Sequence, residues 1–96
     1  MRMPVHRRRS AQLNPDEAFA QALRSARKER GMSQEALGFE SGYHRTYISM
    51  VERGKMNPSL RTILSLAAAL DMPAAQLVQD VERLLGSPWR RNSAPP

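Results

Sequence analysis

The chain has no cysteine among its 96 residues. This absence excludes a disulfide framework, a thiolate metal site and a cysteine nucleophile. The sequence also has no apolar run near the roughly 18 to 20 residues that a membrane-spanning helix requires. Its N-terminus lacks the apolar segment of a secretory signal. We therefore expect a soluble, cytoplasmic protein with no membrane partner.

Groups for catalysis are scarce as well. The two histidines, His6 and His44, are too few for a metal site. No serine, histidine and acid combination has a recognisable catalytic context. We expect no enzymatic activity, no catalytic residue, no metal and no cofactor.

Acidic residues are missing from both ends of the chain. Residues 1–14 contain four arginines and no acid, residues 86–96 contain two arginines and no acid, and residues 15–85 are neutral. The net charge of +6 therefore belongs to the ends. Within the neutral centre, residues 42–61 hold a local excess that suits a phosphate backbone. Its cations are Arg45, Arg53, Lys55 and Arg61, against Glu52 alone.

Helix-start signals divide the centre into short helices. The segment 14–17, Asn-Pro-Asp-Glu, combines a capping residue, a proline at the first helical position and a glutamate at the third. The helix that follows should end before Gly31, a natural C-terminal cap. Its apolar stripe is formed by Phe19, Ala22, Leu23 and Ala26.

Two serines begin later helices. Ser33 caps a second helix and Ser59 a fourth, whose apolar face we place at Leu60, Ile63, Leu64, Ala67 and Leu70. A fifth amphipathic helix begins at Ala74 and is stopped by Gly86. The sequence predicts one all-α domain of five helices, residues 14–85, between a disordered basic arm, residues 1–13, and a flexible basic tail, residues 86–96.

The second and third helices are joined by a turn centred on Gly42. Gly38 is small enough for a close helix crossing, and Leu37, Ile48 and Val51 are spaced to face one core. This pattern is typical of a helix-turn-helix that places its second helix in the DNA major groove.

The period of the third helix predicts its outward face. If Ile48 and Val51 point inward, the helical rotation of about 100° per residue places a second set of side chains on the side away from the core. Glu52 falls on an inner flank. This second set offers a guanidinium, hydroxyls and a thioether, which are groups suited to base edges and to the thymine methyl. We therefore favour a base-reading face over an ordinary surface helix. The outward residues are Thr46, Ser49, Met50 and Arg53, with Arg45 on the flank; Lys55 and Asn57 follow in the loop, where phosphates would pass.

Three segments, ALRSARKERGMSQEALG, RTYISMVERGKMNPSL and TILSLAAALDM, resemble the Cro/C1-type helix-turn-helix domain of the Xre family, with its lambda repressor-like fold. The Arg-Thr-Tyr-Ile-Ser string is similar to controller proteins of restriction-modification systems. The resemblance covers roughly residues 16–78. It implies a nucleoid-associated transcriptional regulator that binds double-stranded operator DNA as a dimer and represses or activates nearby promoters.

The same resemblance implies roles for single residues. Gln34 would contact a phosphate or base edge, Arg45, Thr46 and Met50 would match base-facing positions, with Ser49 among them, and Arg27 and Glu52 would form a structural ion pair. Two positions depart from the family pattern. His44 replaces the usual small cap, so its imidazole is available to a phosphate. Met50 replaces a polar reader, which favours a thymine methyl as its contact.

Three questions stay open at the level of sequence. Val81, Leu84 and Leu85 extend beyond what a small domain must bury, so we expect them in a homodimer interface, although they could serve the monomer core alone. The arginines at 7–9 either touch DNA or form a solvated tail. The alternative function is a protein-interaction module such as an antitoxin, although only about ten residues follow the fifth helix.

Overall fold

A computed structural model describes residues 13–86. These residues form five α-helices and no strand, which confirms the all-α prediction. The helices are α2 (Pro15–Glu29), α3 (Gln34–Ser41), α4 (Arg45–Glu52), α5 (Leu60–Ala69) and α6 (Ala74–Leu85). The predicted arm, residues 1–13, and tail, residues 86–96, lie outside the described residues except for Leu13 and Gly86.

Side-chain caps fix where the helices begin. The Asn14 side chain accepts a hydrogen bond from the Glu17 N–H (2.8 Å), and the Glu17 carboxylate accepts one from the Asn14 N–H (3.0 Å). This reciprocal pair satisfies two amides that the helix itself leaves free. Ser33 and Ser59 cap α3 and α5 with one bond each: their hydroxyl oxygens accept from the N–H groups of Ala36 and Thr62. His44 stands at the cap of α4 without a capping hydrogen bond from its side chain.

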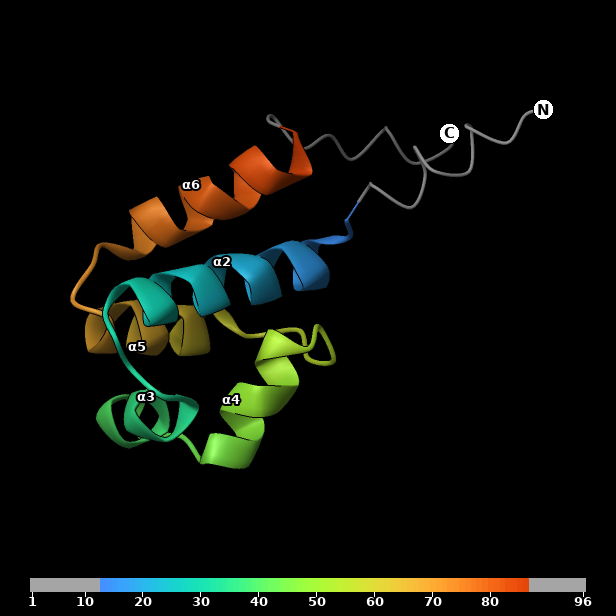
Figure 1. The fold of residues 1–96 in the computed structure, drawn as a ribbon. Coiled ribbons are helices and arrows are strands. Elements are labelled where there is room, and N and C mark those ends of the chain that lie inside the picture. The colour runs from blue at the N-terminus through green and yellow to red at the C-terminus, as the bar shows by residue number, and fades with distance from the viewer. Residues whose placement is uncertain (1–12, 87–96) are drawn as a thin grey trace.

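The helices close around one small core (Figure 1). In that view α6 lies above α2, α5 lies behind α2, and the pair α3 and α4 lies below. Each helix contributes a fully buried leucine or isoleucine, and burying such a side chain contributes about 1.5–3 kcal/mol. These five are Leu23, Leu37, Ile48, Leu66 and Leu77.

The buried face of α5 agrees with the predicted one at Ala67 and Leu70 but differs from it at Leu60 and Leu64. Leu60 and Leu64 are 70% and 51% exposed, whereas Leu66 is fully buried. Apolar residues surround most of this helix, so its period alone does not select a face. Besides Ala67, the core takes Thr62 and Leu66, one turn apart. The polar group of Thr62 is tolerated there because its hydroxyl is bonded to Ser59 and Tyr43.

No helix within residues 13–86 has both the length and the apolar character needed to cross a membrane.

Candidate nucleic-acid interface

The turn between α3 and α4 is tight and requires two glycines. Gly42 ends α3 with a φ of 84°, a left-handed conformation that glycine adopts without steric cost. Gly38 lies against the backbone at the start of α4: a Cβ there would stand 2.7 Å from the carbonyl oxygen of Tyr43. The pair of helices therefore forms the compact helix-turn-helix that the sequence predicts.

The burial of α4 agrees with the expected orientation. Ile48, Val51 and Glu52 are buried. Arg45, Thr46 and Arg53 are exposed, and Ser49 and Met50 are partly exposed. The outer face of α4 thus presents the predicted guanidinium, hydroxyl and thioether groups to the surroundings.

Two tyrosines attach the beginning of α4 to the rest of the domain. The rings of Tyr43 and Tyr47 stack with centroids 5.1 Å apart. The hydroxyl of Tyr43 also forms a 3.0 Å hydrogen bond with the Thr62 hydroxyl of α5. We did not predict this attachment, although two tyrosines four residues apart signal a neighbouring pair where the chain enters a helix.

A buried carboxylate attaches the end of α4. Glu52 has a fully buried side chain, and its two oxygens accept hydrogen bonds from Arg27 Nε (2.6 Å) and Nη2 (2.9 Å). Gln34 Nε2 donates a third bond to Glu52 Oε1 over 3.0 Å. The hydrogen bond to Glu52 raises the pKa of Arg27. One carboxylate therefore joins α2, α3 and α4.

Arg24 is a further member of this cluster that the sequence did not reveal. Its Nη2 donates to the backbone carbonyl of Glu52 over 2.8 Å. Its Nε lies 3.9 Å from Glu52 Oε1, and its side chain is 48% exposed. Arg24 precedes Arg27 by one helical turn, so the shared face of the two arginines was the signal available for it.

Most of the other residues predicted to contact DNA are exposed around α4. His44 lies at its beginning, and Lys55 and Asn57 lie in the loop after it. Gln34 is half-buried because its side chain reaches Glu52. Among residues 13–86 there is no cluster of three side chains that could hold a metal ion. The surface is suited to binding a polyanion through cations and hydrogen-bond donors.

The sequence and the fold were compared with those of known proteins. A family model described as helix-turn-helix matches residues 23–77. The chain belongs to the Cro/C1-type helix-turn-helix family. It has the DNA-binding fold of transcriptional regulators, and two of its relatives are named a transcriptional regulator and a control protein.

The control protein C.SmaI of Serratia marcescens is 44% identical over 62 residues, which cover 65% of this chain and 74% of that protein. The HTH-type transcriptional regulator y4dL of Sinorhizobium fredii is 43% identical over 56 residues, which cover 58% of this chain but only 29% of that protein. The crystal structure of the restriction-modification controller protein C.AhdI from Aeromonas hydrophila is 48% identical. It has a TM-score of 0.63 and covers 65% of this chain and 94% of that chain.

In this Cro/C1-type domain, the residues predicted for a dimer interface have unequal surroundings. Val81 is partly buried and packs against the domain's own core. Leu85 is partly buried, whereas Leu84 is 42% exposed. Val78 is exposed on the same helix. The exposed apolar side chains of α6 are therefore Val78 and Leu84, which lie on either side of the partly buried Val81.

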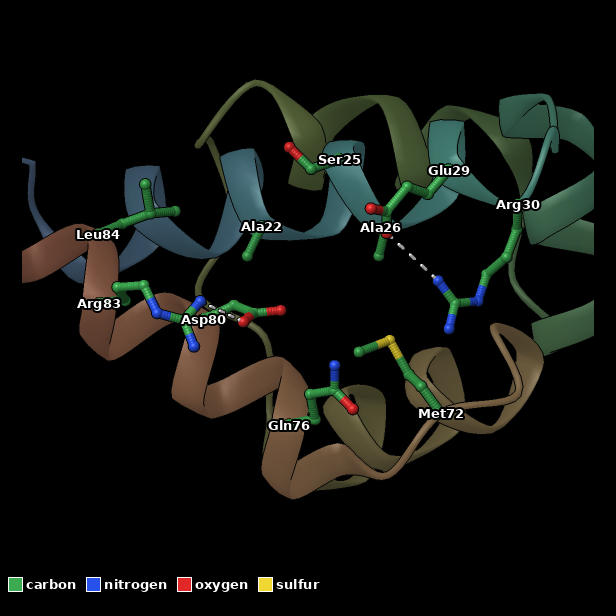
Figure 2. A pocket seen from close by; sticks show the side chains of 10 residues that line it. All are labelled: Ala22, Ser25, Ala26, Glu29, Arg30, Met72, Gln76, Asp80, Arg83 and Leu84. Atoms are coloured by element: carbon green, nitrogen blue, oxygen red, sulfur yellow. Dashed lines mark hydrogen bonds and ion pairs between the residues drawn. The ribbon is translucent and has the colours of Figure 1, made fainter.

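A groove away from α4 lies between α2 and α6 (Figure 2). Its charged groups already have protein partners: Arg83 Nη1 donates to Asp80 over 2.7 Å, and Arg30 donates to the Leu70 carbonyl. Leu84 lies at one end of this groove. The groove offers no converging set of unpaired polar groups of the kind that fixes a small ligand.

Proposed function

We propose that this protein is a sequence-specific transcriptional regulator that inserts α4 into the major groove of an operator. The observation that carries the proposal is the division of α4 into a core-facing side, with Ile48 and Val51, and an exposed side of varied polar groups. A helix with such an exposed side fits the groove and offers donors and acceptors to base edges. The residues we assign to base reading are Arg45, Thr46, Ser49 and Met50.

Phosphate contacts would position this helix. Arg53, Lys55 and Asn57 follow the base-reading turn, and the segment 42–61 has four cations against one acid. His44 and Gln34 lie near the other end of α4, where the opposite strand would pass. These contacts supply affinity without sequence information, whereas the base-reading residues supply the preference.

The regulator acts as a homodimer in the cytoplasm, where it meets chromosomal DNA. Val78 and Leu84 leave apolar surface on α6, and a two-fold axis through such a surface makes an interface that is complementary to itself. Two copies of α4 then face two half-sites of a pseudo-palindromic operator. In keeping with relatives named control proteins, we propose that it represses or activates promoters near that operator.

The direct test is a selection of bound duplexes from a random library, followed by mobility-shift titration at a stated salt concentration. We expect enrichment of a pseudo-palindrome whose half-sites are one helical turn apart. Met50→Ala should relax the preference at a single thymine position while the rest of the site stays unchanged. Equal binding to all duplexes by the wild-type protein would refute sequence-specific regulation.

A further inference from the structure

A groove continues the proposed DNA-binding face from α4 onto α2. It lies between the N-terminal half of α2 and the end of α4, and Gln21, Arg24, Arg53 and Lys55 are among its lining residues. The two walls are close: a Cβ at Gly54 would stand 3.3 Å from Cγ of Glu17. Figure 1 shows the end of α4 running up to this part of α2. Cations from α2 and from the turn and loop after α4 therefore face one space.

The charge of this groove is not neutralised by its own acids. The Glu52 carboxylate is fully buried and bound by Arg27, so one carboxylate serves two guanidinium groups and the surplus positive charge lies on the exposed Arg24. Glu17 also lines the groove, and its carboxylate is engaged by the Asn14 N–H. Arg24, Arg53 and Lys55 thus face a single accessible acid, which favours an anion in the groove.

Arg24 is held in position before any ligand arrives. Its Nη2 is bonded to the backbone carbonyl of Glu52, close to the end of α4, while about half of the side chain is exposed. A guanidinium has five N–H donors in a rigid fork, so donors remain for an anion. Anchoring the side chain also lowers the entropy that it loses on binding. A fixed, half-exposed arginine is suited to binding two oxygens of a single phosphate.

We propose that Arg24, with Arg53 and Lys55, binds a phosphodiester of the operator backbone beside the major groove. This assignment rests on the proposed function, since it supposes that α4 lies in that groove. It gives α2, which α3 separates from the base-reading helix in the sequence, a direct part in docking. Arg24 then links one DNA phosphate to the carbonyl end of the base-reading helix.

The salt dependence of DNA binding tests the charge of this site. We expect Arg24→Gln to reduce the slope of log K against log salt by about 0.9, the value of one lost phosphate contact on duplex DNA. Arg24→Lys should restore most of the slope because it restores the charge. Arg83→Gln is the matched control, since Arg83 is an exposed arginine of α6 outside this groove. If the slope of log K against log salt is the same for Arg24→Gln and Arg83→Gln, the proposal is wrong.

A second measurement locates the phosphate and separates contact from positioning. Single phosphates of the operator are replaced by neutral methylphosphonates, one at a time. We expect one replacement that weakens the wild-type protein and leaves Arg24→Gln unaffected. If every replacement weakens the two proteins equally, Arg24 only supports α4 through the Glu52 carbonyl, and the proposal is wrong. Melting curves of each variant ensure that binding is measured on folded protein.

The two proposals fail in different ways. If the wild-type protein enriches no sequence from a random library, sequence-specific regulation is wrong, yet the slope on random duplex still tests the Arg24 site. If the wild-type protein enriches an operator and Arg24→Gln keeps the wild-type slope, the Arg24 site is wrong and regulation stands.

Discussion

Gly38 and Tyr43 are in such close backbone contact that a Cβ on Gly38 would stand only 2.7 Å from the Tyr43 carbonyl oxygen. The atom it would meet belongs to the backbone, so no side-chain rotation relieves the overlap. The contact fixes the angle between α3 and α4, and with it the direction of the outer face of α4.

The first prediction concerns this contact. Gly38→Ala should destabilise the domain by about 1–3 kcal/mol, the usual cost of forcing an extra methyl group into a packed interior. Helix propensity acts in the opposite direction by roughly 0.5–1 kcal/mol. Ala68→Gly on the exposed side of α5 calibrates that propensity effect. Urea unfolding measures both, and a Gly38→Ala protein more stable than the wild type would contradict the close approach.

The second prediction compares a buried ion pair with an exposed one. Glu52→Ala leaves Arg27 buried without its partner and should lower the free energy of unfolding by about 3 kcal/mol. Asp80→Ala breaks the Asp80–Arg83 pair, whose arginine side chain is 67% exposed, and should cost less than about 1 kcal/mol. Both values come from urea unfolding curves. Equal losses in the two variants would exclude a structural role for the Arg27–Glu52 pair.

The third prediction concerns base reading by Arg45. Arg45→Ala should weaken binding to the selected operator by about 1–3 kcal/mol, with a much smaller loss on random DNA. The difference arises because a bidentate contact to guanine exists only on the preferred site. Titrations of both duplexes at one salt concentration give the two values. An equal loss on both would reassign Arg45 to a phosphate contact.

The fourth prediction concerns dimerisation. The double substitution Val78→Asp and Leu84→Asp should yield a folded monomer, because both side chains are exposed in the described domain. Val81 is left intact, since it packs against the domain's own core. Cooperative binding to half-sites about 34 Å apart should be lost with the dimer.

Sedimentation measures the oligomeric state, and the matched control places aspartates at Leu60 and Leu64, the exposed apolar pair of α5. A dimer that survives the α6 substitutions and dissociates with the α5 substitutions would move the interface to α5.

Local signals in the sequence were sufficient for most of the fold. The cap at Asn14 and the glycine at 42 act within four residues of themselves, so they are visible in the chain order. The outward face of α4 followed from two inward residues and the helical period. The buried side of α5 did not, because apolar residues occur on most of its circumference and packing decided between Leu64 and Leu66.

Long-range partners were beyond sequence reasoning. Arg24 and Glu52 are 28 residues apart, and Tyr43 and Thr62 are 19 apart. The local sequence around each of these four residues does not indicate its partner, because the contacts depend on how the helices cross. The Arg27–Glu52 pair was anticipated only through the family resemblance, whereas the bond from Gln34 to the same carboxylate was not anticipated at all.

The buried attachment of α4 through Glu52 and the tyrosines has a consequence for how such regulators diversify. The bonds that orient the helix belong to its inner side and to its two ends, whereas Arg45, Thr46 and Met50 lie on the opposite side. If α4 reads the operator as proposed, substitutions on its outer side would alter the preferred operator at little cost to the fold. Proteins that share this scaffold would then each recognise a different promoter within one cell.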